Sequence, residues 1–522
     1  MTLNNKHIIL LIFPVFIYWI ILLFNVGHTW DESYFTISSQ NHYYFFEEIF
    51  SKIKNNKINS FGNIFNKTYF QKYFSYTPEH PSFFNLFGGL LLYISAKFGM
   101  KSFYMLQVFR LSNLILLFVF IIFCKKILEN SNKNFVLAFS SLICLLFFNP
   151  RFMTFSVMAT SDFCMTTFTF ISAYYYLSDN NCSKKNIFFS ALFCGLAGAS
   201  KISGLFILPV ILLHLLLVNH KNFLRYAAVY IIIVPVVTFI FYPVLWLDIF
   251  SGIKFLSGFF LKHYQNYVLY FGKIYSPETG PAPFHYPLFY LVFGNPEIFV
   301  ILFFSALIYS KKYFTKMNFF FLLYIFMLFI MLMKPGSPSY DEIKLFLPAM
   351  PFMCLLCLKP LEKFIACFKK MKYKILIFLC FVFFSVYPAI NNLKYPTLYY
   401  NILAPSLKSL EKIGFDIDIR GELFSSDVIK ILNSSDKNEL SIRIAGQEPS
   451  IFNVYNSYYK VFNKRVECSL FQTKFDYLIL LNHKSLFQKV DHYYWDNIKP
   501  EATVKYKGVT LYSVYKINTP GH

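Results

Sequence analysis

Long runs of apolar residues dominate this sequence and leave few folds open to it. The first run, residues 7–25, contains no formally charged side chain. It is long enough to cross the roughly 30 Å hydrocarbon core of a membrane as one helix. No small-residue cleavage site follows it, so we expect an uncleaved first helix rather than a signal peptide. Further apolar runs bring the expected number of spans to about eleven; they lie near residues 103–124, 134–149, 153–177, 187–200, 203–218, 225–246, 286–309, 317–333, 344–358 and 374–390.

The composition agrees with a polytopic membrane protein. Of 522 residues, 56% are hydrophobic and only 15% are charged, whereas soluble domains carry about 25% charged residues. The net charge of +22 would suggest nucleic acid as the partner of a soluble protein. Here much of that charge lies in short loops between apolar runs, where it reports membrane topology instead. We therefore expect membrane lipids, and no nucleic acid, among the partners.

The run 83–98 decides the orientation of everything that follows it. It is short and contains Gly88 and Gly89. If it does not cross, sixteen cations fall in the cytoplasmic loops: Lys125, Lys126, Lys133, Lys184, Lys185, Lys221, Arg225, Lys311, Lys312, Lys316, Lys359, Lys363, Lys369, Lys370, Lys372 and Lys374. Only four then fall in the short outer loops: Arg151, Lys201, Lys334 and Lys344. Because cytoplasmic loops are rich in lysine and arginine, we interpret 83–98 as an interfacial or re-entrant helix on the outer face.

Three larger outer segments follow from this topology. They are residues 26–102, roughly 247–285, and the polar tail 391–522. The tail has alternating runs typical of strands at 441–445, 477–481, 502–507 and 509–516, with helical stretches near 402–413 and 427–433. We expect a transmembrane domain over residues 1–390 and a small α/β domain over 391–522.

Several ionisable residues stand close to the expected outer boundary. Each has an ordinary explanation, such as a solvated loop, an acidic helix start or a snorkelling side chain. Asp162, which lies about ten residues inside its expected span, and Lys201, which lies between two short apolar runs, are harder to explain in this way because charge in a membrane needs a partner or a water-filled cavity. The full set comprises Asp31, Glu32, Glu79, His80, Arg110, Asp162, Lys201, Tyr340, Asp341, Glu342 and Lys344.

This mixture of carboxylates and cations suits a lipid-linked anionic substrate. Arginine and lysine are the usual partners of a phosphate. A nearby carboxylate can take a proton from an acceptor hydroxyl.

The motifs that hold these residues resemble a known family. In order and spacing they are similar to those of GT-C fold glycosyltransferases of the protein O-mannosyltransferase and aminoarabinose-transferase type. The resemblance covers roughly residues 1–425, with Ser82 in place of a family proline and Lys344 where arginine is common. The motifs are Asp31-Glu32-Ser33-Tyr34, Glu79-His80-Pro81, Phe109-Arg110-Leu111-Ser112, Thr160-Ser161-Asp162, the stretch 195–201, and the stretch 340–348 followed by Pro351.

The resemblance implies transfer of a sugar from a polyprenyl-phosphate donor at the outer side of the membrane, usually with inversion. Asp31 is the expected general base. Glu32 would orient Asp31 or the acceptor, or else have a structural role. Arg110, Lys201 and Lys344 are the expected partners of the leaving phosphate.

Four further residues, Glu79, His80, Asp162 and Tyr340, are expected to position the substrate. No cofactor is required. A divalent metal held by Asp31 and Glu79 stays an option because hard cations favour carboxylates.

The residues leave the donor sugar open, and the acceptor can be a lipid, a glycan or a protein. Composition favours a bacterial inner membrane with the active face in the periplasm. One alternative is a transporter or flippase of a lipid-linked or other anionic substrate, whose site would lie near the bilayer midplane. Another is an interaction protein in which the spans only anchor the tail.

Overall fold

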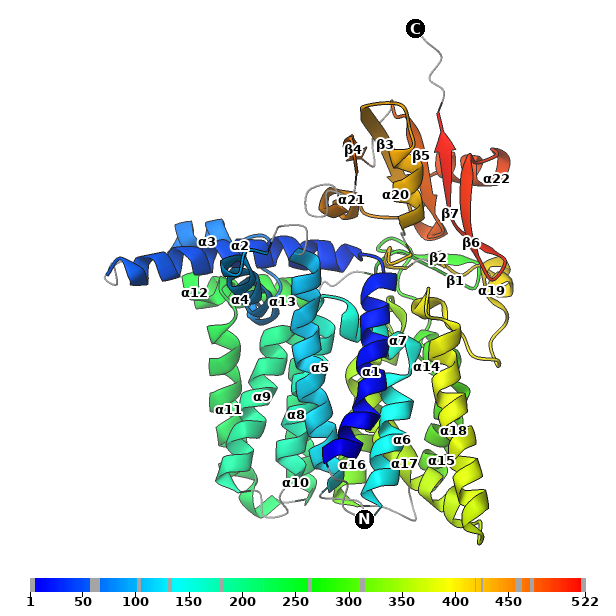
Figure 1. Ribbon diagram of the computed structural model, residues 1–522. Helices are drawn as coiled ribbons and strands as arrows, with labels where there is room; N and C mark the ends of the chain where they lie inside the picture. Colours follow the sequence, from blue (N-terminus) through cyan, green and yellow to red (C-terminus); the bar gives the residue numbers. More distant parts are fainter. Residues whose placement is uncertain are drawn as a thin grey trace.

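The computed structural model describes residues 5–56, 66–100, 105–129, 134–178, 183–218, 220–261, 265–309, 315–417, 419–423, 426–455, 462–469 and 474–517. Lys133, Lys311, Lys312 and the start of the 103–124 run lie outside the described residues. The described chain is mostly helical, with a helical bundle that carries a mixed sheet at one end (Figure 1). This is the expected combination of an all-α membrane bundle and a small α/β domain.

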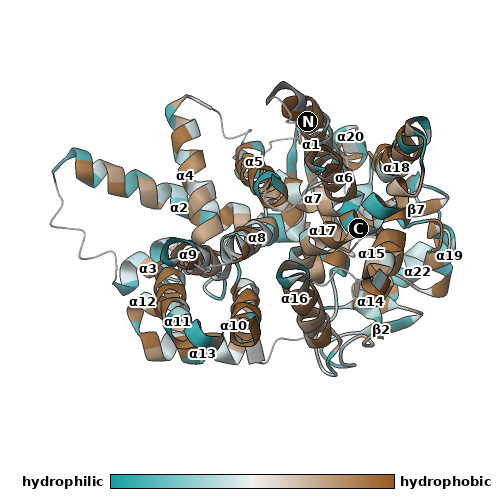
Figure 2. Cartoon of the chain, turned by 90° about the horizontal axis from the view of Figure 1, so that it is seen from below, coloured by the Kyte–Doolittle hydropathy of each residue, from teal (hydrophilic) through white to brown (hydrophobic). Residues whose placement is uncertain are grey.

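Apolar helices that run roughly parallel to one another form the bundle (Figure 1). Seen along its axis, the bundle is largely hydrophobic (Figure 2). Its helices are α1 (Asn5–Asn25), α5 (Met105–Glu129), α6 (Phe135–Phe147), α8 (Ser161–Leu177), α9 (Lys184–Ser200), α10 (Ile207–Val218), α11 (Phe223–Ile240), α15 (Glu297–Tyr309), α16 (Lys316–Met333), α17 (Met350–Ala366) and α18 (Met371–Asn391).

The expected count of about eleven spans is not confirmed. Among the described residues, six helices are long and apolar enough to cross a membrane, or up to eight if two bent helix pairs each count as one span. Helices α8, α9 and α10 also belong to the bundle. They are not counted as spans because they have only 17, 17 and 12 residues. The chain is nevertheless a multi-pass integral membrane protein.

Two predicted spans are broken helices. The run 153–177 is divided between α7 (Pro150–Val157) and α8. A second bend precedes it, because α7 meets α6 at 76°. The run 286–309 is divided between α14 (Tyr286–Phe293) and α15, which meet at 115°. Thr160 has extended backbone and stands at the N-cap of α8. Asp162 therefore lies in the first turn of a helix, and its predicted place deep inside a span is wrong.

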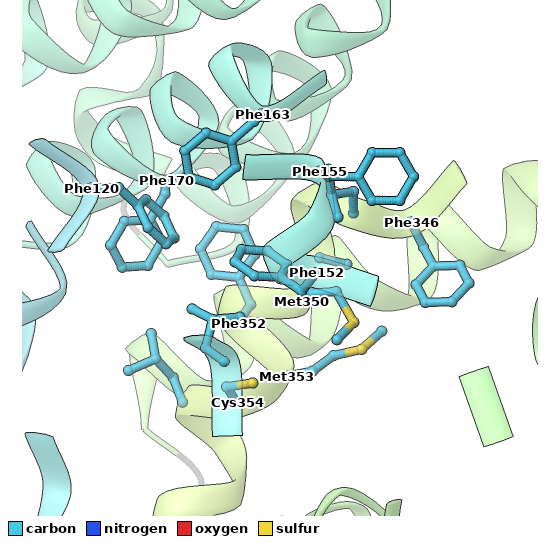
Figure 3. Close-up of a cluster of buried hydrophobic side chains, with 14 of the residues drawn as sticks. Phe120, Phe152, Phe155, Phe163, Phe170, Phe346, Met350, Phe352, Met353 and Cys354 are labelled. Carbon is cyan, nitrogen blue, oxygen red and sulfur yellow. The ribbon is translucent and has the colours of Figure 1, made fainter. Parts of the chain in front are cut away.

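Aromatic rings fill the centre of the bundle (Figure 3). Phe120 of α5 contacts Phe170 of α8, with ring centroids 5.0 Å apart, and Phe152 of α7 lies 6.1 Å from Phe163. Close helix packing elsewhere depends on small residues. A side chain at Gly195 of α9 would meet Val237 of α11 at 2.7 Å, so glycine is required for this approach.

A second group of helices lies across one end of the bundle (Figure 1). Seen along the axis, α2 and α4 reach sideways from it (Figure 2). Helix α4 corresponds to the helix expected over 83–98, whereas the long helix α2 was not predicted. This group comprises α2 (Trp30–Lys54), α3 (Lys67–Tyr73), α4 (Phe83–Lys97), α12 (Val244–Leu247) and α13 (Ile249–Leu261).

The tail forms a five-stranded sheet at the same end of the molecule (Figure 1). Its order is β4-β3-β5-β7-β6, with β4, β3 and β5 parallel and β7 antiparallel to its neighbours. Strand β4 and helix α22 were not predicted. The elements are α19 (Leu407–Ile413), α20 (Ser426–Asn433), β3 (Glu439–Ala445), α21 (Ser450–Val454), β4 (Arg465–Ser469), β5 (Tyr477–Leu481), α22 (Lys489–Asn497), β6 (Ala502–Tyr506) and β7 (Val509–Lys516), and a separate hairpin pairs β1 (Val268–Tyr270) with β2 (Lys273–Tyr275).

Candidate active site

The start of α2 presents the first acidic pair. Thr29 is the N-cap and forms a capping box with Glu32. The Thr29 hydroxyl accepts from the Glu32 backbone N–H, and the Glu32 carboxylate accepts from the Thr29 backbone N–H. A threonine three residues before a glutamate is the pattern that such a box requires. Asp31 and Glu32 also place negative charge at the helix N-terminus, where the macrodipole favours it. The sequence therefore starts α2 here and fixes where Asp31 stands.

Asp31 is paired with a lysine that lies far from it along the sequence, near the C-terminal end of the transmembrane domain. Its Oδ2 lies 2.5 Å from Nζ of Lys344, which also donates to Oδ2 of Asp341 at 2.7 Å. The Asp31 side chain keeps 28% of its surface exposed, and Lys344 keeps 11%. This ion pair is therefore accessible on the carboxylate side.

A second lysine–carboxylate pair links α9 to α8. Nζ of Lys201 donates to Oδ1 of Asp162 at 2.7 Å. Lys201 follows the last residue of α9 and has extended backbone, and the 3-10 helix η3 (Ile202–Phe206) comes next. This break between short apolar helices is the arrangement that the sequence indicated. Lys201 is 28% exposed, whereas Asp162 is 3% exposed.

His80 lies among these charges. Burial lowers its pKa to about 4; the positive charge of Lys201 adds to this shift, and Asp31 and Asp162 oppose it. The imidazole is thus neutral at pH 7. Next to it, burial raises the pKa of Glu79, whose Oε1 lies 3.8 Å from Nε2 of His80. The structure therefore brings together both ion pairs and the Glu79-His80 motif.

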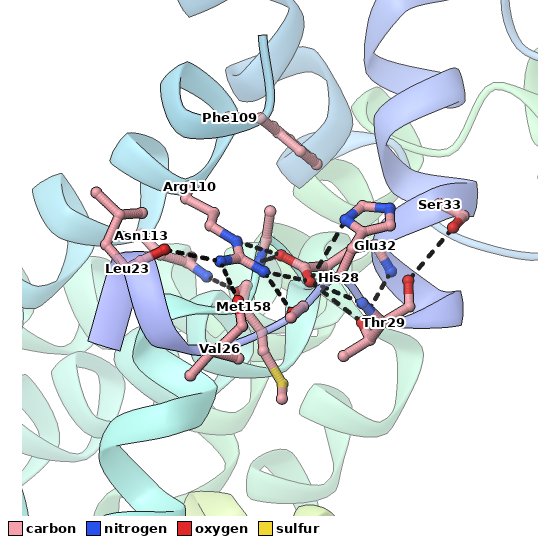
Figure 4. Close-up of polar contacts among 12 residues, drawn as sticks. Leu23, Val26, His28, Thr29, Glu32, Ser33, Phe109, Arg110, Asn113 and Met158 are labelled. Carbon is pink, nitrogen blue, oxygen red and sulfur yellow. Dashed lines mark hydrogen bonds and ion pairs between the residues drawn. The ribbon is translucent and has the colours of Figure 1, made fainter. Parts of the chain in front are cut away.

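Arg110 and Glu32 form a separate, closed pair (Figure 4). Nε and Nη2 of Arg110 each lie 2.8 Å from a Glu32 oxygen, and the remaining Arg110 donors reach the carbonyls of Leu23, Val26 and Gly27. Glu32 also accepts from the backbone of Ala159 at 2.7 Å. Although burial opposes it, Arg110 holds the pKa of Glu32 below its usual value.

This geometry differs from the phosphate-binding role expected for Arg110, and it favours the structural alternative for Glu32. All five guanidinium N–H groups of Arg110 have acceptors, so none is left for a phosphate. Glu32 is fully buried and faces Arg110 rather than the Asp31 side. The sequence could not separate these roles, because a charged residue near a membrane boundary has the same signature in both.

The Tyr340 motif contributes through its acidic neighbours. Tyr340 itself is half-buried. Asp341 and Glu342 both have left-handed backbone, with φ of 61° and 56°. Glu342 begins the 3-10 helix η6 (Glu342–Ala349), and its carboxylate pairs with Arg151.

Sequence reasoning missed three residues next to the site. Asp341 belongs to the 340–348 motif, but the motif alone predicts no role for it. Arg151 was counted only as an outer-loop cation; it is buried and stacks on Tyr400, with the guanidinium 4.7 Å from the ring centre. Arg420 lies in the tail, where the sequence offered no signal.

A metal site receives little support from the donor set. Within the described ranges, no group of three or more histidine, cysteine, aspartate or glutamate side chains is placed to hold a metal ion. Asp31 is engaged by Lys344 and Glu79 adjoins His80. The two carboxylates alone do not form a complete ligand set, so no step is routed through a metal.

Sequence comparison finds no matching family model and no matching characterised protein. Structure comparison does find similar structures. The chain is similar to ArnT from Cupriavidus metallidurans bound to undecaprenyl phosphate, with a TM-score of 0.53, 12% identity and coverage of 98% of each chain. It also matches the oligosaccharyltransferase from Archaeoglobus fulgidus tethered to an acceptor peptide, with a TM-score of 0.49, 12% identity, and coverage of 88% of this chain and 63% of that one.

The likeness to ArnT extends over almost the whole chain, including the tail that carries no sequence motif. The chain therefore has the GT-C fold that its motifs resemble.

Proposed function

We propose that this GT-C-fold membrane protein is a glycosyltransferase that moves a sugar from a polyprenyl-phosphate donor to an acceptor hydroxyl. The observation that carries the proposal is the meeting of two accessible lysine–carboxylate pairs, Asp31–Lys344 and Asp162–Lys201, around His80 at one end of the bundle. The fold likeness to an ArnT structure with undecaprenyl phosphate bound supports a lipid-phosphate donor.

The reaction is one inverting displacement. The acceptor oxygen attacks the anomeric carbon while the bond from that carbon to the phosphate oxygen breaks. Asp31 takes the acceptor proton as general base. Negative charge grows on the departing phosphate, and Lys344 and Lys201 stabilise it there, which lowers the barrier because the charge develops in the transition state.

The Asp31–Lys344 contact gives the donor phosphate a second effect. Lys344 donates to Asp31 and Asp341 in the structure, which leaves one of its three N–H groups for a phosphate. The charge of a phosphate bound there weakens the attraction of Lys344 for Asp31. Asp31 is then left free to accept the proton of the acceptor hydroxyl. The base is thus available when both substrates are present.

The remaining residues hold the substrates and the site. His80 is neutral and offers hydrogen bonds to the sugar, with Glu79 beside it as a positioning group. Tyr340, next to Asp341, is a further positioning group. Asp162 orients Lys201. We reassign Glu32 and Arg110 from chemistry to the support of the turn between α1 and α2, because their charges satisfy each other.

The active face is the outer face of the membrane. The end of α5 and the start of α9, which carry several of these cations, lie at the end of the bundle opposite α2 and the tail sheet (Figure 1). The positive-inside rule makes that end cytoplasmic. In a bacterial inner membrane, α2 and the tail then face the periplasm. The acceptor is a lipid, a glycan or a protein at that face.

The test is a transfer assay on purified protein with a panel of radiolabelled polyprenyl-phosphate sugars and native membrane extract as acceptor. We expect wild type to remove label from one donor and Asp31→Asn to lose at least about 100-fold in rate, the range for a general base. The matched control is Asp248→Asn, an exposed aspartate that bonds Ser251 at the α12–α13 junction.

Equal transfer by wild type and Asp31→Asn would refute Asp31 as base. Label that crosses the membrane but stays on its lipid would favour a flippase instead.

A further inference from the structure

The tail reaches the start of α2 through its backbone. The carbonyl of Arg420 accepts from the N–H of Trp30 at 3.2 Å, and the carbonyl of Glu422 accepts from Gly27 at 3.0 Å. Trp30 is the first residue of α2, and the first N–H groups of a helix have no partner within it. A backbone carbonyl of the tail therefore satisfies the first N–H group of the helix that carries Asp31.

The intervening residue shows how closely this segment is fitted. Gly421 has φ of 84°, and a side chain there would overlap Gln447 after strand β3, with 1.2 Å between its Cβ and Nε2 of Gln447. Glycine suits this left-handed backbone, and a larger residue would also have to displace the end of the Gln447 side chain. The segment is thus packed against Gln447, which follows strand β3 of the tail sheet.

The Arg420 side chain reaches the other half of the site. Its Nη2 lies 3.4 Å from Oε2 of Glu342 and 3.0 Å from Glu422, and its Nη1 lies 3.5 Å from the carbonyl of Asp341. The guanidinium is buried and also covers the Phe155 ring. Glu342 is thereby held between Arg420 and Arg151.

This contact falls on strained backbone. Asp341 and Glu342 are consecutive non-glycine residues in the left-handed region, a conformation that persists only where the surroundings impose it. The Asp341 carboxylate in turn holds Lys344 at 2.7 Å. The position of Lys344 against Asp31 therefore depends on this turn.

We infer that Arg420 is a positioning residue for the transfer reaction. Its carbonyl fixes the helix start that bears Asp31, and its guanidinium fixes the left-handed turn that places Lys344. It contacts both supports of the Asp31–Lys344 pair and is hydrogen-bonded to neither member of it. This inference rests on the proposed function, because it gives the tail a role in the same site.

Lysine is the informative substitution at this position. It keeps the charge, but a single ammonium lacks the planar fork that reaches Asp341, Glu342 and Glu422 together. We expect Arg420→Lys to lower kcat by about tenfold to hundredfold, the effect of a small misplacement of reacting groups. The donor KM should change by less than about threefold, because uniform binding is retained.

Arg443→Lys is the matched control. Arg443 is also a tail arginine with a buried acidic partner, Asp491 at 2.8 Å, but it lies within the tail sheet. A purely structural role for Arg420 predicts that both variants lose activity only as far as they lose thermal stability. Positioning predicts that only Arg420→Lys loses kcat at full folded content.

Two further measurements use the same purified protein in lipid nanodiscs. Hydrogen exchange at amides 341–346 should accelerate in Arg420→Lys and stay at the wild-type rate in Arg443→Lys. Effects on kcat should be non-additive when Arg420→Lys is combined with Lys344→Arg, and additive when it is combined with Lys201→Arg.

The two hypotheses fail differently. Normal kcat and unchanged exchange in Arg420→Lys, with an active wild type, would overturn only the inference. Absence of transfer by wild type with every donor would refute the proposed function and, with it, any positioning role in that reaction.

Discussion

Asp31 and Glu32 are neighbours in the first turn of α2, yet they lie in opposite environments. Glu32 points into the protein and meets Arg110, whose donors are all used by Glu32 and three backbone carbonyls. Asp31 meets Lys344 at an accessible surface, where 28% of its side chain is exposed. One residue of helix rotation, about 100° in a helix of 3.6 residues per turn, separates the two.

The difference distinguishes an ion pair that only supports the structure from one that can take part in the reaction. A closed pair with no spare donor stabilises one conformation and has nothing to offer a ligand. An accessible pair can exchange its partner for a phosphate or a hydroxyl. The same residue types therefore serve two purposes a few ångströms apart, and substitutions should tell them apart.

The largest effect is expected at the closed pair. Arg110→Ala leaves the Glu32 carboxylate buried without its cation, and breaking such a pair by removing one partner costs about 3–5 kcal/mol. We expect loss of folded protein, measured by thermal unfolding in detergent. Arg465→Ala, which removes a 66%-exposed arginine beside Glu467, should change stability by less than about 0.5 kcal/mol. A stable Arg110→Ala protein with a specific catalytic defect would restore Arg110 to the phosphate site.

The accessible pairs should show the reverse pattern. Lys344→Ala and Lys201→Ala each remove a stabilising contact to the leaving phosphate, worth about 2.7–4 kcal/mol of barrier by analogy with oxyanion donors. We expect the kcat of the folded protein to fall by about 100-fold or more. Asp162 and Asp341 are buried and lose their cation, so the melting temperature should also fall, but by less than in Arg110→Ala because the exposed Lys201 and Asp31 sides of these pairs admit water. The measurement is initial-rate kinetics with the preferred donor. Loss of folding without loss of kcat in the remaining folded protein would contradict the division between the two regions.

The smallest effect concerns pH. His42 is buried in α2, and burial lowers its pKa from 6.5 to about 4. Between these values the unfolded chain binds more protons than the folded one, so stability falls as pH falls from 6.5 to 4 and levels off below that range. His42→Asn, whose amide can still donate to the Ser38 carbonyl, should reduce this slope by at most about 1.4 kcal/mol per pH unit. An unchanged slope in urea titrations at several pH values would mean that His42 is not buried as a neutral group.

The sequence predicted the class of fold and many residues of the candidate site. It did not predict which of these residues contact one another. Apolar runs predicted the helices, and the outer-loop cations included Lys201 and Lys344, which both reach the site. It placed Asp162 too deep, because a continuous apolar run conceals the extended residue Thr160 at which α7 and α8 separate. It also left α2 undetected, since polar residues interrupt α2 along its whole length and leave no long apolar run of the kind that indicated α4.

What the sequence determined by itself follows from local rules. Run length specifies a membrane bundle, charge distribution predicts its orientation, and the Thr29–Glu32 box specifies where α2 begins. Only the tertiary structure decided which carboxylate meets which cation. Asp31 pairs with a lysine 313 positions away, and Arg420 approaches from the tail. The cause is physical: burial and partner choice depend on groups brought together by packing of distant helices, and no local pattern records that packing.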